Sequence, residues 1–82
     1  MLSPSLMQRI IAEAGMDDGI PAVVAAYHFE CSVATIKGWA ARGRLTEVGR
    51  HPRLGRLYRW GDLIEADRIT RDTWNPNRRE AA

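Results

Sequence analysis

The sequence predicts a small, mainly α-helical domain in which three to four helices carry a two-stranded β-hairpin. The chain has 82 residues, of which 45% are hydrophobic, enough for one modest core. Apolar residues recur at helical spacing in three stretches before residue 43 and in one after residue 60, and between them two short stretches flank a turn rich in Gly, Pro and Arg. No internal repeat or linker divides the chain. We therefore expect one domain over residues 1–74 and a disordered tail over residues 75–82.

The first predicted helix begins at Ser3 or Ser5, where Ser-Pro offers a cap and a proline for the first turn. Its core-facing residues are Leu6, Ile10 and Ala14, with Met7 and Ile11 beside them. A loop over residues 15–19 follows. Ile20-Pro21 then opens a second helix, whose apolar residues are Val23, Val24, Ala26, Tyr27 and Phe29.

The third predicted helix has the clearest boundaries, because Ser32 is a natural N-cap before residues 33–42 and Gly43 can end the helix in the left-handed conformation. Its inward residues are Val33, Ile36, Trp39 and Ala40. The opposite side carries only small or basic residues, namely Ala34, Thr35, Lys37, Gly38, Ala41 and Arg42. Since only Glu30 and Cys31 separate Phe29 from the cap, the second and third helices are expected to cross steeply, as in a helix-turn-helix.

After Gly43 the spacing of apolar residues changes. Residues 45–49 and 56–60 predict two short strands, and residues 50–55 form the basic turn of a hairpin between them. A last helix starts at Gly61-Asp62 and carries Leu63, Ile64, Ile69 and Trp74. In a domain this small, Trp39 and Trp60 are expected in the core rather than at a binding surface.

The positive charge of the chain is concentrated in one segment. Residues 34–60 carry seven Lys and Arg side chains against Glu47 alone, a local charge of +6, whereas the whole chain carries +2. Such an excess repels itself, and a polyanionic partner would relieve the repulsion. Six of the seven cations are Arg, whose planar fork suits phosphate. The alternative is a solvated face that only promotes solubility.

Several classes of protein find no support in the sequence. The single cysteine, Cys31, cannot form an intramolecular disulfide, and no apolar run is long enough to cross a bilayer. The first residues lack the pattern of a signal peptide, so we expect a cytoplasmic protein. No catalytic constellation, metal-ligand cluster or phosphate-binding loop is present. We therefore expect neither enzymatic activity nor a cofactor.

The segment from Phe29 to Leu45, followed by residues 56–59 and 62–64, resembles the winged helix-turn-helix of MerR-type regulators and of the shorter excisionase-like proteins of phages and mobile elements. The resemblance covers roughly residues 20–66. Three features depart from the family pattern. Glu30 stands where the turn usually has glycine, a helix precedes the usual start, and too few residues follow the wing for an effector domain.

The resemblance implies a small transcriptional regulator or excisionase-like architectural factor that binds double-stranded DNA, with the third helix in the major groove and the hairpin as a wing. The expected DNA-binding residues are Ser32, Ala34, Thr35, Lys37, Gly38, Arg42, Arg44, Arg50, His51, Arg53, Arg56 and Tyr58. Because few side chains can read bases, we expect repeated sites bound by further copies, or help from a partner protein. The alternative function is an interaction module that binds an acidic partner protein.

Overall fold

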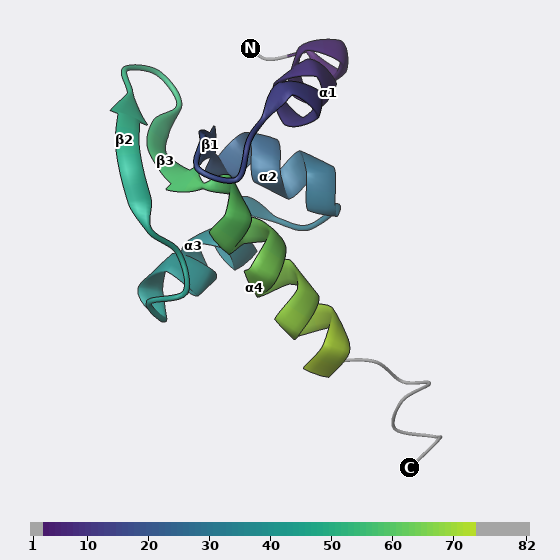
Figure 1. Cartoon of the computed structure of the whole chain (residues 1–82), viewed down its shortest axis with the longest axis vertical. Coiled ribbons are helices and arrows are strands. Elements are labelled where there is room, and N and C mark those ends of the chain that lie inside the picture. The colour runs from purple at the N-terminus through teal and green to yellow at the C-terminus, as the bar shows by residue number, and fades with distance from the viewer. Residues whose placement is uncertain (1–2, 74–82) are drawn as a thin grey trace.

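The computed structural model describes residues 3–73, which form four helices and one three-stranded antiparallel sheet. In chain order these are α1 (Pro4–Glu13), β1 (Gly19–Pro21), α2 (Ala22–Phe29), α3 (Val33–Ala41), β2 (Glu47–His51), β3 (Gly55–Arg59) and α4 (Trp60–Thr73). Figure 1 shows the β2–β3 hairpin along one side of the molecule, with α3 below it and α1 far from α3. Among residues 3–73, no helix combines the length and the apolar character that crossing a bilayer requires.

The four predicted helices and the hairpin are confirmed. The predicted fold class, mainly α with a two-stranded hairpin, is corrected to mixed α and β because the sheet has a third strand. The strand order is β1-β3-β2, and Ile20 of β1 pairs with Tyr58 of β3. The prediction that Ile20-Pro21 opens a helix is therefore wrong: Pro21 is extended, and α2 begins at Ala22. Local sequence favoured a helix start, whereas pairing with a strand far along the chain decided the outcome.

The core lies where α2, α3 and α4 meet the sheet. Its largest fully buried side chains are Ile20, Val24, Ile36 and Leu63. Trp39 and Trp60 are only 3% and 6% exposed, which confirms that both belong to the core. Phe29 lies between them, with ring centroids 6.1 Å from Trp39 and 5.5 Å from Trp60. Trp74 lies outside the described residues.

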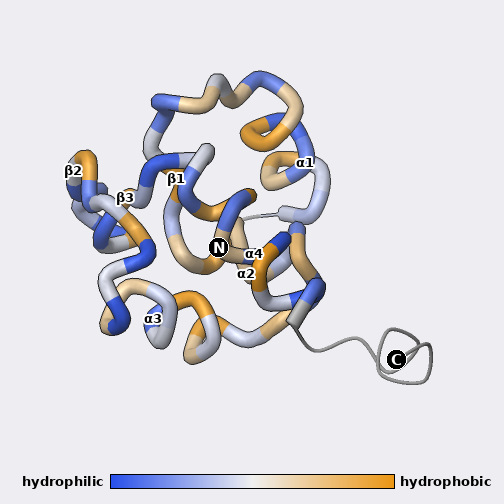
Figure 2. The backbone as a smooth tube through the Cα atoms, turned by 60° about the horizontal axis from the view of Figure 1, so that its bottom comes forward, coloured by the Kyte–Doolittle hydropathy of each residue, from blue (hydrophilic) through white to orange (hydrophobic). Residues whose placement is uncertain are grey.

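Three apolar residues predicted to face the core are instead exposed: Leu6 at 42%, Val23 at 39% and Tyr27 at 39%. In α1 the buried or half-buried residues Met7, Ile10, Ile11 and Ala14 form a stripe at helical spacing, and Leu6 lies at its edge. In α2 the buried residues are Ala22, Val24, Ala25, Ala26 and Phe29. Figure 2 shows how apolar and polar segments alternate along these helices. The predicted inward side is therefore confirmed for the other apolar residues of both helices, and in α2 the alanines Ala22 and Ala25 also face the core.

The connection between α2 and α3 contains a non-glycine residue with positive φ. Glu30 lies in the left-handed region at φ 56° and ψ 45°. The amide of Cys31 donates to the carbonyl of Ala26 at 3.0 Å, which closes the end of α2. The turn is thus built with glutamate in a conformation that glycine adopts more readily, at a modest conformational cost.

Arg59 and Asp62 tie the sheet to the start of α4. The Arg59 guanidinium contacts Asp17 through Nε at 3.0 Å and Asp62 through Nη1 at 3.0 Å. The second carboxylate oxygen of Asp62 accepts from the backbone N–H of Thr46 at 3.0 Å. Hydrogen bonds from Thr46, together with the Arg59 guanidinium, lower the pKa of Asp62 below its ordinary value.

We expect Asp62→Asn to lower the free energy of unfolding at neutral pH by about 1 kcal/mol, because it weakens charge-assisted hydrogen bonds. Since the folded pKa of Asp62 is depressed, its contribution is present above the unfolded pKa and is lost as the pH falls through the folded pKa. Urea unfolding at neutral pH and below about pH 4 should therefore show the wild-type advantage shrinking in acid. A difference independent of pH would contradict this account.

Candidate functional site

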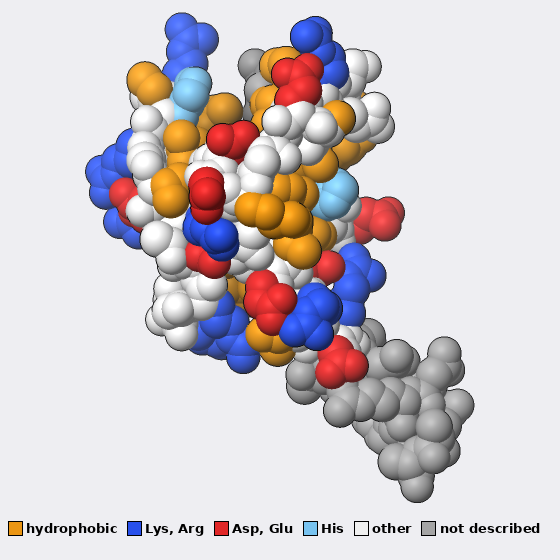
Figure 3. All heavy atoms as spheres, in the orientation of Figure 1, with side chains coloured by type: hydrophobic (Ala, Val, Ile, Leu, Met, Phe, Trp, Pro, Cys, Tyr) orange, Lys and Arg blue, Asp and Glu red, His pale blue; other side chains and the backbone are white. Residues whose placement is uncertain are grey.

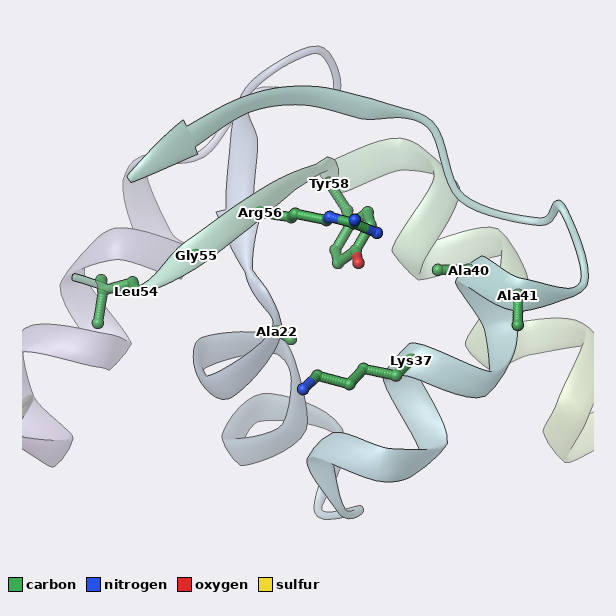
Figure 4. Close-up of a pocket in the computed structure, with 8 residues that line it drawn as sticks. All are labelled: Ala22, Lys37, Ala40, Ala41, Leu54, Gly55, Arg56 and Tyr58. Atoms are coloured by element: carbon green, nitrogen blue, oxygen red, sulfur yellow. The ribbon is translucent and has the colours of Figure 1, made fainter. Parts of the chain in front are cut away.

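A hollow of about 500 Å³ lies between α3 and the hairpin. Its lining residues are Ala22, Lys37, Ala40, Ala41, Leu54, Gly55, Arg56 and Tyr58. Figure 4 shows the Lys37 side chain reaching into it from α3, Arg56 from β3, and the Tyr58 hydroxyl between them. The structure therefore brings together three predicted site residues, Lys37 of α3 and Arg56 and Tyr58 of β3. Strand β2 and two turns separate α3 from β3 in the sequence.

Helix α3 is held by a cap at each end. The Ser32 Oγ accepts from the Thr35 N–H at 3.1 Å, and the two hydroxyl oxygens of Ser32 and Thr35 lie 3.0 Å apart. At the other end Gly43 has φ 76°, and the amide of Arg44 donates to the carbonyl of Trp39 at 3.0 Å. Ser32 and Thr35, both predicted site residues, thus engage their hydroxyls in capping the helix.

The outward face of α3 carries small side chains and one lysine, as the sequence predicts. Ile36 and Trp39 are buried, which leaves Ala34, Lys37 and Ala41 exposed along one side. A Cβ added at Gly38 would meet no atom within 4 Å. Another surface can therefore approach the helix backbone closely along this side.

The hairpin places its arginines toward the same region. Arg50 and Arg56 are register partners, so their side chains project from the same face of the sheet. Glu47 lies between them, with its two carboxylate oxygens 3.4 Å from Arg50 Nε and 3.3 Å from Arg56 Nε. Glu47 was not among the predicted site residues, although its place as the single acid in the basic segment was a signal.

His51 and Gly55 shape the tip of the hairpin. The His51 Nδ1 accepts from the backbone N–H groups of Arg53 and Leu54, each at 3.1 Å, and Gly55 has φ 85°. The Nδ1 atom of His51 therefore stabilises the turn. Arg53 is exposed at this tip.

The cations of the basic segment fall into two groups. Arg50, Arg56 and Arg59 are paired with carboxylates. Within residues 3–73, no carboxylate lies within ion-pairing distance of the others, which are Lys37, Arg42, Arg44 and Arg53. In Figure 3, Lys and Arg side chains stand out along the β2 edge and below α3, whereas those over α4 are mixed with acidic side chains. The surplus of positive charge therefore belongs to α3 and the hairpin.

The remaining candidates for site chemistry are isolated. Cys31 is half-buried, and burial raises the pKa of its thiol, which disfavours the reactive thiolate. Over the described range 3–73, no three His, Cys, Asp or Glu side chains are grouped so that they could hold a metal ion.

No family model, curated protein or solved structure matches the chain.

Proposed function

We propose that the chain binds double-stranded DNA as a small winged helix-turn-helix protein of the MerR or excisionase-like type. In this proposal α2 and α3 are the helix-turn-helix, α3 enters the major groove, and the β2–β3 hairpin is the wing. The observation that supports it most is the hollow that Lys37 of α3 and Arg56 of the hairpin both line. One duplex could contact both elements at once.

The outward face of α3 suits an approach to base edges. The major groove admits an α-helix, and the exposed small residues Ala34 and Ala41 would let the backbone come close. Lys37 would donate to guanine or to phosphate, and the Ala34 methyl would pack against a thymine methyl. Gly38 adds no bulk on this side. Ser32 and Thr35 would act mainly by holding the helix start in place.

The remaining cations suit the DNA backbone. Arg42 and Arg44 follow the end of α3, and Arg50, Arg53 and Arg56 belong to the hairpin. Contacts between such side chains and phosphates position a protein without reading sequence. We therefore expect affinity to come mostly from charge, with modest base discrimination by a single copy, so that repeated sites or a partner protein would complete the specificity. A cytoplasmic regulator or recombination factor fits this mode of binding.

Lys37→Ala is the direct test of the role proposed for α3. Because Lys37 is exposed on a helix that Ile36 and Trp39 anchor, the variant should keep the melting temperature of the wild type. Its affinity for a labelled mixed-sequence duplex should fall by about tenfold at low salt, as expected for the loss of one well-placed cationic contact. Fluorescence anisotropy and thermal unfolding would measure both.

Arg9→Ala is the matched control, because it also removes one exposed positive charge. Figures 1 and 2 both place α1 well away from α3, so this variant should bind duplex nearly as the wild type does. Equal losses for Lys37→Ala and Arg9→Ala would mean that net charge alone governs binding. Absence of duplex binding by the wild type at low salt would overturn the proposed function.

A further inference from the structure

We propose that the hollow between α3 and the hairpin holds one phosphodiester group of the DNA backbone, and that the Tyr58 hydroxyl is a donor to it. This inference rests on the proposed function and deepens it. It gives Tyr58, one of the expected DNA-binding residues, a specific role as a donor to phosphate from a largely buried position. Four kinds of donor meet in this hollow: a phenol, an ammonium group, a guanidinium group and the start of a helix.

The position of the Tyr58 hydroxyl points to a ligand in the hollow. The residue is only 5% exposed, and its ring packs in the core beside its strand partner Ile20. Figure 4 shows its hydroxyl oxygen directed into the hollow. Within residues 3–73 no protein group is hydrogen-bonded to this hydroxyl, and no buried side-chain oxygen is left without a partner, so the hydroxyl oxygen is accessible from the hollow although the ring is buried. An acceptor that enters the hollow can therefore take its hydrogen bond without breaking one within the protein.

The start of α2 opens on the same hollow. Ala22 is the first residue of α2 and one of the lining residues. The N-cap position is Pro21, which makes no side-chain hydrogen bond to the first amides of the helix. These amides and the helix dipole favour an anion at this end.

The charged side chains that line the hollow also favour an anion. Lys37 contributes an ammonium group without a carboxylate partner within the described residues. The Nε of Arg56 lies 3.3 Å from a carboxylate oxygen of Glu47, and a guanidinium group has five N–H donors, so Arg56 can also donate to a ligand. Among the residues that the structure describes, no acidic one lines the hollow. A ligand that only accepts hydrogen bonds and carries negative charge fits these donors, and phosphate has both properties.

The size and position of the hollow favour a phosphodiester of a nucleic acid strand over a free ion. At about 500 Å³ the space is much larger than one phosphate group, and it lies between the two elements proposed to contact DNA. A strand that passed through it would present one phosphate to Tyr58 while α3 occupied the neighbouring groove. Free phosphate shares the same chemistry, so the experiment includes it as a separate probe.

Tyr58→Phe tests the role of the hydroxyl without changing the ring. Because no hydrogen bond within the described residues is lost, the variant should melt at the wild-type temperature or slightly above it. Its affinity for a labelled mixed-sequence duplex should fall by about tenfold, the effect of losing a hydrogen bond to a charged group. Tyr27→Phe is the matched control, since Tyr27 is exposed on α2 and is hydrogen-bonded to Gln8. That control should bind duplex like the wild type.

A second measurement separates this inference from the proposed function. Inorganic phosphate titrated into the labelled protein should shift the NMR amide signals of Ala22 and Lys37 in the wild type, and much less in Tyr58→Phe. Duplex binding that is equal in the wild type and Tyr58→Phe would overturn the inference and leave the proposed function standing. Phosphate shifts that depend on Tyr58, without duplex binding, would support the anion site and overturn its assignment to DNA. If neither duplex binding nor phosphate-dependent shifts were observed, both the inference and the proposed function would be overturned.

Discussion

Replacing Trp39 by alanine is expected to lower the free energy of unfolding by about 3–5 kcal/mol, a large part of the total for a small domain. Trp39 is 3% exposed and contacts Phe29 edge to face, so its removal leaves a cavity at the centre of the core. The same residue fixes which side of α3 faces outward. Urea unfolding followed by circular dichroism would measure the loss.

Trp39→Phe is the control for this prediction. It keeps an aromatic ring beside Phe29 and should be clearly less destabilising than alanine, because a smaller volume is lost. If Trp39→Ala unfolded at the same urea concentration as the wild type, Trp39 would not be a core residue and the orientation of α3 would be wrong.

The combined replacement of Arg50, Arg53 and Arg56 by alanine should have the largest effect on DNA binding. If each contacts a phosphate, affinity for duplex DNA should fall by about two orders of magnitude at low salt, and the dependence of affinity on salt should become shallower by roughly three counterions. The fold should survive, because all three side chains are exposed. Anisotropy titrations over a series of salt concentrations would measure both quantities.

Glu47→Gln is a control of opposite sign at the same place. Glu47 contacts Arg50 and Arg56 and partly neutralises them, so its neutralisation should tighten duplex binding severalfold while changing stability little. If the triple arginine variant bound duplex DNA as tightly as the wild type, the hairpin would not be part of the binding surface. Weaker binding by Glu47→Gln would show that the carboxylate holds the arginines in place rather than competing with DNA.

The sequence predicted best the elements whose boundaries depend on neighbouring residues. Helix α3 was predicted almost residue for residue, because Ser32 and Gly43 mark its ends through local backbone chemistry. The hairpin followed from turn formers and a change in apolar spacing. Strand β1 was missed because it exists through pairing with β3, and three residues around a proline carry no strand signal of their own.

The residues of the candidate site were predicted from the sequence, but the contacts among them were not. Sequence spacing could place Lys37 on the outward side of α3, yet it could not show that Arg56 reaches the same hollow, because that depends on how the hairpin packs. The role of His51 as an acceptor for the turn and the position of Glu47 between two arginines likewise depend on three-dimensional contacts. Tyr58 was predicted as a DNA-binding residue of the hairpin, and its near-complete burial was visible only in the fold.

The most direct test of a shared surface on α3 and the hairpin is an NMR titration of the full chain with a mixed-sequence duplex at low salt. The account predicts that amide shifts concentrate in residues 34–44 and 50–58, while α1 changes little. Shifts that concentrate in α1 and the outer side of α2, or no shifts at all, would contradict it.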